Sequence, residues 1–179
     1  MTMSNRVITP EATLSYPNLF EPRAGLDGQE PKYSTELIFA GGTDLGELKA
    51  AAQAVAVAKW GDNIPKNLRS PFREGDMDRE GKPEYEGSTF ISAKSKQRPV
   101  ILYGPDRRQA EPEEVYPGCV ARVSVTPFAY DVNGNKGVSF FLNNVWVLRG
   151  GDMIGGRGGD DFATIEVDAS AFGEEVTPF

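Results

Sequence analysis

Apolar and polar residues alternate along much of the chain, a pattern that predicts β-strands. Residues 32–40, 89–93 and 100–103 form short β-prone runs, separated by stretches rich in proline, glycine and charge. The strongest local pattern covers residues 119–148, where two long β-prone runs flank Asn133-Gly134, the preferred dipeptide of a type I′ hairpin turn. The sequence therefore predicts a mainly β protein with one long β-hairpin.

The turn also determines which hairpin residues share a face. If Asn133-Gly134 is the two-residue turn, Val132 pairs with Asn135, and each further pair follows outwards along both strands. One face is then apolar and is expected to join the core: Cys119, Ala121, Val123, Val125, Ala129, Val138, Phe140, Leu142 and Trp146. The other face mixes polar, cationic and aromatic side chains: Arg122, Ser124, Thr126, Phe128, Tyr130, Ser139, Phe141 and Asn143. Pro127 cannot donate a hydrogen bond to the ladder, so we expect a bulge there.

A single helix is predicted within the β pattern, from Asp44 to Trp60. Asp44 and Glu47 have the spacing of a capping box, an alanine-rich run follows, and Gly61 stands where the helix ends. Apolar residues recur at helical spacing on one face: Leu45, Leu48, Ala52 and Val55. Strands, one central helix and a closing hairpin together predict a small closed β-barrel capped by that helix. Residues 61–87 hold three prolines and four glycines and are expected to form a long loop or a functional insertion.

The absence of one residue type narrows the possible functions. The 179 residues include no histidine and one cysteine, Cys119. Without an imidazole there is no Ser-His-Asp or Cys-His relay and no histidine-based metal centre, so a binder is favoured over an enzyme and no cofactor is expected. A single cysteine forms no internal disulfide, which suits a reducing compartment, and Cys119 is expected to be buried. No apolar run approaches the length that spans a bilayer, so we expect no membrane association.

Negative charge is concentrated at one end of the chain. The net charge of −7 divides into −1 over residues 1–149 and −6 over residues 150–179. Six of the ten residues from 150 to 159 are glycine, which predicts a flexible linker, and the acidic, aperiodic residues 160–179 suit a disordered tail. The expected organisation is a body over residues 1–149, a linker over 150–159 and an acidic tail over 160–179.

A local basic stripe contrasts with the nearly neutral body. Residues 88–110 contain five basic residues and one acidic residue, and their alternation places Phe90, Lys94 and Lys96 on one face. Cations that track phosphates and aromatic rings that stack on bases are what single-stranded nucleic acid requires. The candidate phosphate contacts are Lys94, Lys96, Arg98, Arg107, Arg108 and Arg122. The candidate stacking residues are Phe90, Tyr103, Phe128, Tyr130 and Phe141. The alternative is that the aromatics belong to the barrel core and the lysines only solubilise an edge.

An acidic run raises a metal-binding alternative. Glu74, Asp76, Asp78 and Glu80 alternate, but an EF-hand loop that starts at Asp76 has Gly87 where the bidentate glutamate is required. A solvated acidic loop is therefore favoured, and no metal site is assigned. A magnesium-dependent nuclease that uses these carboxylates is the weaker, enzymatic alternative.

The last residues resemble a known type of peptide ligand. Glu174, Glu175, Pro178 and Phe179 place acidic groups, a proline and a C-terminal phenylalanine at the chain end. This tip is similar to that of bacterial single-stranded DNA-binding proteins, and its ring and carboxylates can occupy an apolar pocket with a basic rim. We therefore expect these four residues to recruit replication or recombination proteins, and the tail to compete with DNA for the basic surface.

Five blocks of the body are similar to one bacteriophage family. They are residues 14–22 (LSYPNLFEP), 31–34 (PKYS), 94–99 (KSKQRP), 115–119 (VYPGC) and 137–145 (GVSFFLNNV). In this order they resemble a family of OB-fold single-stranded DNA-binding proteins, first described as a domain of unknown function. The resemblance implies an OB-type barrel that binds single-stranded DNA without strong sequence preference. It also implies a role in phage replication or recombination, in the cytoplasm of the bacterial host.

The leading hypothesis is thus a non-enzymatic single-stranded DNA-binding protein with a regulatory tail. The alternative from another class is a structural β-barrel protein of a virion or another assembly, in which the aromatic hairpin face is a protein interface. The sequence leaves open the choice between DNA and RNA, the oligomeric state, including a homo-oligomer, and the identity of the partner of the tail.

Overall fold

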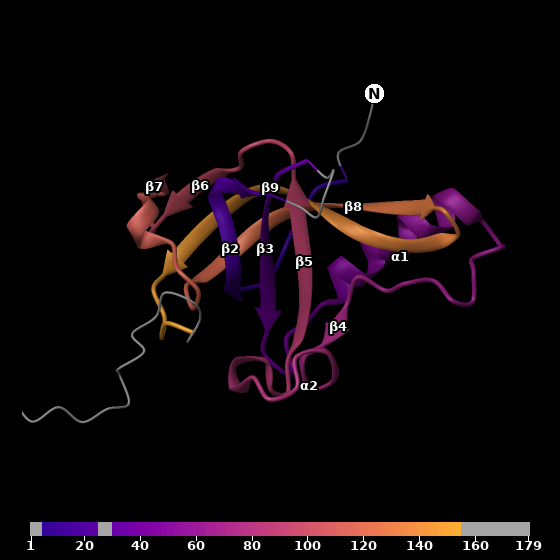
Figure 1. Cartoon of the computed structure of the whole chain (residues 1–179), viewed down its shortest axis with the longest axis horizontal. Coiled ribbons are helices and arrows are strands. Elements are labelled where there is room, and N and C mark those ends of the chain that lie inside the picture. The colour runs from indigo at the N-terminus through magenta and orange to yellow at the C-terminus, as the bar shows by residue number, and fades with distance from the viewer. Residues whose placement is uncertain (1–4, 25–29, 155–179) are drawn as a thin grey trace, which may run out of the picture.

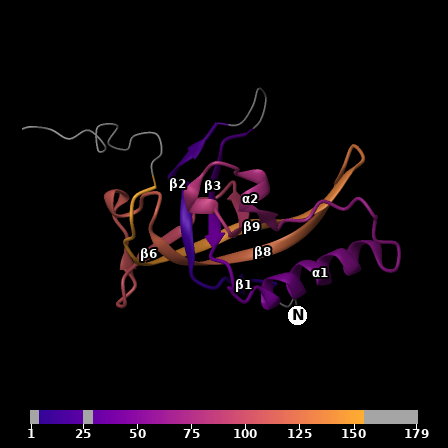
Figure 2. The same cartoon turned by 90° about the horizontal axis from the view of Figure 1, so that it is seen from below.

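The computed structural model describes residues 5–24 and 30–154, so the tail residues Glu174, Glu175, Pro178 and Phe179 lie outside the described part of the chain. The described strands form one mixed sheet that curls on itself, with a long helix along one side (Figures 1 and 2). The strands are β1 (Val7–Ile8), β2 (Ala12–Arg23), β3 (Lys32–Phe39), β4 (Arg73–Glu74), β5 (Thr89–Ser95), β6 (Val100–Tyr103), β7 (Arg108–Gln109), β8 (Val120–Val132) and β9 (Asn135–Arg149). The helices are α1 (Gly46–Trp60), α2 (Gly75–Asp78) and the 3-10 turns η1 (Pro83–Tyr85) and η2 (Pro112–Glu114).

Five of these strands close into a ring. β2 pairs with β3, β3 with β5, β5 with β9 and β9 with β8, and β8 returns to β2. The ladders β2–β8 and β5–β9 contain two residue pairs each, so the barrel closes only partly. A partly open barrel of five strands is the OB architecture, which confirms the expected OB-type barrel, whereas the full closure that was also expected is not reached. β1 extends the sheet beside β8 (Figure 2), while β6 and β7 extend it beside β9, beyond the ring (Figure 1).

The long hairpin has the predicted register from its turn outwards. β8 and β9 pair Val132 with Asn135, and the same register continues to Val125 and Leu142. Along this stretch the face predicted for the core is buried or half-buried, and the mixed face is half-buried or exposed. The two-residue periodicity therefore assigns the two faces correctly near the turn.

A bulge occurs at a different place from the one predicted. Pro127 pairs in register with Phe140, so the bulge expected at Pro127 is wrong. The register shifts instead between Ser124 and Val125, opposite which Asn143 is the extra residue of β9. The extra residue reverses the alternation of side chains in the part of β9 that follows it. Trp146, predicted to point into the core, therefore lies half-buried on the other face of the hairpin.

Helix α1 begins two residues later than predicted. Leu45 occupies the N-cap position, and the carboxylate of Asp44 accepts a hydrogen bond from the Gly46 amide at 2.9 Å. The N-cap residue Leu45 makes no side-chain hydrogen bond to the first turn of the helix. The predicted capping box of Asp44 with Glu47 is therefore wrong. The apolar face is confirmed, because α1 lies along β8 and β9 (Figure 2) and packs on the core through Leu45, Leu48, Ala52, Val55 and Ala56.

Strand β2 is long although it contains Pro17 and Pro22, which cannot donate to a ladder. Its pairing with β3 shifts register between Ser15 and Asn18 and again between Asn18 and Arg23. Each proline thus falls within an irregular stretch, where no ladder hydrogen bond is required of it. Because the register shifts interrupt the two-residue alternation, the sequence pattern alone does not reveal β2 as a strand.

Phe90 belongs to the core and not to a binding surface. Predicted to share an accessible face with Lys94 and Lys96, it is fully buried and packs edge-on against Tyr85, with ring centroids 5.0 Å apart. Ile38 completes this small cluster. The predicted stacking role of Phe90 is wrong, because Tyr85 covers this end of β5.

The segment 61–87, expected as a loop or an insertion, carries β4, α2 and η1 and is tied to the barrel by polar contacts. The hydroxyl of Tyr85 lies 2.6 Å from Glu36 Oε1 and 2.8 Å from Ser15 Oγ. Arg79 donates to Glu36 Oε2 at 2.7 Å. Burial, followed by the hydrogen bond to Glu36, raises the pKa of Tyr85 above its usual value. Tyr85 therefore stays protonated and bonded at neutral pH.

The residues that follow β9 turn back onto the barrel. Tyr116 OH donates to the carbonyl of Gly151 at 2.8 Å, and the amide of Ile154 donates to the carbonyl of Pro117 at 2.9 Å. Ile154 also packs against the cluster that contains Tyr85 and Phe90. Within residues 5–24 and 30–154, no helix is long and apolar enough to cross a membrane.

Candidate nucleic-acid interface

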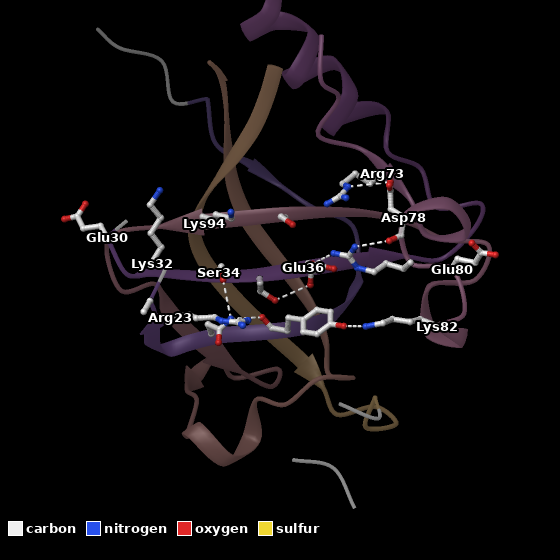
Figure 3. A pocket seen from close by; sticks show the side chains of 16 residues that line it. Arg23, Glu30, Lys32, Ser34, Glu36, Arg73, Asp78, Glu80, Lys82 and Lys94 are labelled. Carbon is white, nitrogen blue, oxygen red and sulfur yellow. Dashed lines mark hydrogen bonds and ion pairs between the residues drawn. The ribbon is translucent and has the colours of Figure 1, made fainter. Parts of the chain in front are cut away.

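Two adjoining grooves cross the face formed by β2, β3, β5 and β9. The β-face groove, about 720 Å³, lies over β2, β3 and β5 and is bordered by residues of the α2 segment (Figure 3). The hairpin groove, about 550 Å³, lies between the end of β5 and the β8–β9 hairpin. Lys32 and Lys94 line both, so the two grooves form one continuous surface.

The hairpin groove is strongly cationic. Its basic lining residues are Arg6, Lys32, Lys94, Lys96 and Arg98. No carboxylate of the described chain lines it, although Lys96 forms an exposed ion pair of 3.0 Å with Glu30 at its border. Arg98 lies over the ring of Phe20, 5.9 Å from the centroid. This groove therefore attracts anions.

An aromatic pair forms one wall of the hairpin groove. Phe128 and Phe141 are diagonal neighbours on the mixed face of the hairpin, and their rings stack with centroids 4.0 Å apart at 21°. Phe141 is 48% exposed, whereas Phe128 is half-buried behind it. Tyr130 is tilted against Phe128 at 6.3 Å and does not line the groove. The pair thus offers one supported ring face to a planar ligand.

The β-face groove has mixed charge. Its cations are Arg23, Lys32, Arg73, Arg79, Lys82 and Lys94, and its carboxylates are Glu30, Glu36, Asp78 and Glu80. Two of the arginines are paired, Arg79 with Glu36 at 2.7 Å and Arg73 with Asp78 at 3.5 Å. In Figure 3, Lys32 and Lys94 lie at one end of this groove and Lys82 at the other.

Several of these residues were not candidates from the sequence. Arg23 and Lys32 lie on strands whose irregular pairing hides their faces. Arg73 and Lys82 come from the segment 61–87, which has no periodicity that could orient them. Lys32 had one available signal, because it lies in the block 31–34 that resembles the phage family.

Besides Phe90 and Tyr130, four predicted site residues line neither groove and have other partners: Tyr103, Arg107, Arg108 and Arg122. Arg108 is hydrogen-bonded to Glu114 at 2.8 Å, and its guanidinium lies 4.9 Å from the ring centroid of Tyr103. Arg107 lies over the ring of Trp146 at 5.5 Å. The Nε of Arg122 donates to the carbonyl of Thr9 at 3.0 Å. Of the predicted set, the structure brings together Lys94, Lys96, Arg98, Phe128 and Phe141.

The pairing with Arg108 lowers the pKa of the Glu114 carboxyl group. The hydrogen bond from Arg108, followed by that from the Glu111 amide, lowers the pKa of Glu114 to about 2. Glu114 is therefore charged at neutral pH and holds Arg108 beside η2. Binding of a phosphate by Arg108 would have to compete with this carboxylate.

The acidic run is occupied by contacts within the fold. Asp76 accepts a hydrogen bond from the Gly87 amide at 3.0 Å, and Asp78 pairs with Arg73. In the part of the chain that the structure describes, no group of three or more acidic or cysteine side chains could hold a metal ion. Of the run, Asp78 and Glu80 border the β-face groove.

Comparison with known proteins identifies the family. A family model described as Enterobacter phage Enc34, ssDNA-binding protein, matches residues 5–172. The chain belongs to this family. Protein p50 of Acyrthosiphon pisum secondary endosymbiont phage 1 is 36% identical over 159 residues, which cover 81% of this chain and 84% of that protein. Membership of the Enc34 family confirms the resemblance predicted from the five sequence blocks, and the family is one of binding proteins, in agreement with the expectation of a non-enzymatic binder.

Solved structures agree with this assignment. The single-stranded DNA-binding protein from bacteriophage Enc34, in complex with ssDNA, is 27% identical, with a TM-score of 0.74 over 85% of this chain and 90% of that chain. A C-terminal truncation of the same protein is 28% identical, with a TM-score of 0.71 over 83% and 88%. Bacteriophage T7 gp2.5, a single-stranded DNA-binding protein, shares the fold, with a TM-score of 0.60 and 15% identity over 91% and 95%.

Proposed function

We propose that this member of the Enc34 family binds single-stranded DNA along its two adjoining grooves during phage DNA replication or recombination in the bacterial host cell. The hairpin groove carries the proposal, because it combines five cations with a supported aromatic face and is lined by none of the described carboxylates. The Enc34 protein complexed with ssDNA, which shares the fold and the family, supports the same ligand class.

The chemistry of the hairpin groove favours an unpaired strand. A base can stack on the exposed ring of Phe141 only if it is released from a duplex, and the neighbouring cations then neutralise its phosphates. Gln97 and Asn144 supply amides that can donate to or accept from any base edge. Stacking and adaptable amides tolerate every base, so binding without strong sequence preference follows.

Titration of labelled oligo-dT by fluorescence anisotropy at several salt concentrations tests the function, with RNA of equal length and duplex DNA as competitors. We expect affinity to fall with salt, log K losing roughly 0.7 per neutralised phosphate for each tenfold rise. Duplex DNA should compete weakly. Absence of binding, or a preference for duplex, would contradict the proposal, and stable self-assembly without DNA would instead support a structural protein of an assembly.

The same titration with Phe141→Leu tests the role of the aromatic wall. Leucine keeps apolar cover over Phe128 but removes the stacking face, so affinity should fall roughly 5- to 100-fold, as expected when one stacked base is lost. The salt slope should stay unchanged, because no cation is removed. Val57→Ala, at an exposed site on α1 outside both grooves, is the control and should bind like the unaltered protein.

The tail is proposed to regulate this binding and to recruit partners. In this proposal residues 1–149 form the DNA-binding domain, residues 150–159 a linker and residues 160–179 an acidic tail with the partner-binding tip Glu174, Glu175, Pro178 and Phe179. Ile154 packs on the cluster of Tyr85, whose hydroxyl bonds Glu36 in the wall of the β-face groove. The described chain therefore ends beside that groove, and the acidic residues of the tail are proposed to compete there with phosphates.

Truncation after Ile154 should tighten binding of oligo-dT several-fold at low salt, and the gain should disappear at high salt, where charge competition is screened. A full-length variant with Asp160, Asp161, Glu166 and Asp168 changed to the amides should show the same gain. Deletion of Phe179 alone should leave DNA affinity unchanged and abolish capture of a replication or recombination partner. Unchanged or weaker binding by the truncated protein would refute competition by the tail.

A further inference from the structure

A second exposed aromatic residue lies at a distance from the aromatic wall of the hairpin groove. Among the described residues, the large apolar side chains with high exposure include two aromatics, Phe141 at 48% and Tyr16 at 41%. Phe141 lines the hairpin groove and Tyr16 the β-face groove. Because Lys32 and Lys94 line both grooves, the two rings belong to one continuous surface.

The backbone holds Tyr16 in an unusual conformation. Its φ is +47°, a left-handed value that non-glycine residues rarely adopt, and Pro17 follows it. The pairing of β2 with β3 shifts register at this point, between Ser15 and Asn18. The side-chain amide of Asn18 donates to the Tyr16 carbonyl at 3.1 Å and stabilises the irregular turn. Residues held in sparsely populated backbone conformations cluster at functional sites.

Lys82 fixes the ring of Tyr16 from the segment between α2 and η1. Its ammonium donates to the phenolic oxygen and lies 4.8 Å from the ring centroid. Because the ammonium is bonded to the hydroxyl, it lies at the hydroxyl end of the ring and covers neither face. Figure 3 shows Lys82 at the end of the β-face groove away from Lys32 and Lys94, with the dashed line that marks this bond.

Packing does not explain the position of Tyr16. Every ring contact found among the described aromatics involves other residues, so Tyr16 stacks on no neighbour within residues 5–24 and 30–154. The core cluster beside it is formed without it, by Ile38, Tyr85 and Phe90. The ring instead borders a groove with cations on its floor and its far side.

We propose that Tyr16 is a second base-stacking platform, at the opposite end of the binding surface from Phe141. The strand passes from Phe141 over Lys94 and Lys32 to Tyr16, and Lys82 both orients the ring and supplies a cation for the adjoining phosphate. This inference rests on the proposed function and extends it from one stacking point to two, joined by a basic floor. A short oligonucleotide can occupy only one of the two points.

The test compares variants of Tyr16 on oligo-dT of two lengths, about 16 and about four nucleotides, the limits of the usual site of one OB domain. Tyr16→Leu should weaken binding of the long strand roughly 5- to 100-fold without changing the salt slope. Tyr16→Phe, which keeps the ring and loses the bond to Lys82, should stay within about threefold, the effect of one lost hydrogen bond. Binding of the short strand, limited to the stronger hairpin groove, should be unchanged in both variants. In a double variant with Phe141→Leu the two losses should multiply, as independent contacts do.

Photo-crosslinking gives an independent readout that does not depend on a stable variant. A long strand that carries 5-iodouracil should crosslink the unaltered protein at both Tyr16 and Phe141, as located by mass spectrometry. Unchanged affinity of Tyr16→Leu, an equal loss in Tyr16→Phe, or crosslinks at Phe141 without Tyr16 would overturn the inference and leave the proposed function intact. Failure of the unaltered protein to bind oligo-dT would instead overturn the proposed function itself.

Discussion

Replacement of Lys94, Lys96 and Arg98 together with alanine is expected to weaken binding of single-stranded DNA roughly 100-fold at ~0.1 M salt and to lower the salt slope by about 2. All three line the hairpin groove, and each cation that neutralises a phosphate contributes about 0.7 to the slope. The ion pair of Lys96 with Glu30 does not protect it, because both side chains are largely exposed and such pairs contribute little.

Anisotropy titrations of oligo-dT over a range of salt concentrations measure both quantities. A matched control removes Lys49, Lys59 and Lys66, which are exposed on and after α1 and line neither groove. This control changes the net charge of the protein by the same amount as the groove variant does. It should change the salt slope much less than the groove variant. If the control weakened binding as strongly, the effect would be one of overall charge, and the hairpin groove would not be the phosphate track.

Arg79→Ala is expected to lower the free energy of unfolding by about 3 kcal/mol, the lower end of the range for buried ion pairs, because the pair of Arg79 with Glu36 is partly buried. Glu36 is 14% exposed in its side chain and would lose the 2.7 Å bond to Arg79. The guanidinium also lies 4.9 Å from the ring centroid of Phe90 and 5.7 Å from that of Tyr85. Its loss therefore uncovers the small cluster that holds the segment 61–87 on the barrel.

Urea unfolding followed by circular dichroism checks this value, with equal m-values as evidence of the same transition. Arg73→Ala is the control, because its 3.5 Å pair with Asp78 is exposed and should contribute less than about 1 kcal/mol. Adding Glu36→Gln to Arg79→Ala should restore part of the stability, since no unpaired charge is then left buried. Equal effects of the Arg73 and Arg79 substitutions would refute a special role for the pair of Arg79 with Glu36.

Local patterns predicted the elements whose determinants lie close together in the chain. The Asn133-Gly134 turn sets the hairpin register as far as Val125 and Leu142, and the apolar spacing of α1 identifies the face that packs on the barrel. The prediction failed where one residue changed the register. Asn143 is an extra residue in β9, and its amide is hydrogen-bonded to Thr126 at 2.8 Å. The β9 residues that follow it as far as Val147 therefore lie on the opposite face from the predicted one, whereas β8 keeps its predicted faces.

Phe90 shows the second kind of limit. Phe90 and Lys94 lie four residues apart on β5 and share a face, as predicted. Phe90 is nevertheless buried, whereas Lys94 is exposed. The difference is made by Tyr85, which packs on Phe90 from a segment with no periodicity of its own. Periodicity assigns a face to a residue, but it does not show which part of that face another segment covers.

The sequence by itself determined the fold class, the hairpin and the family, because turn dipeptides, two-residue alternation and short sequence blocks are local properties of the chain. It also determined the type of chemistry, since cations and aromatics are interleaved in it and histidine is absent. Only the tertiary structure decided which of them meet. Lys32, Lys94 and Phe141 come from three different strands, and the closing of the ring brings them to one surface. Arg107, Arg108 and Arg122 contact other partners outside that surface. Those of Arg107 and Arg122 are distant in sequence, and Glu114, six residues from Arg108, lies in a 3-10 turn, so periodicity reveals none of these contacts.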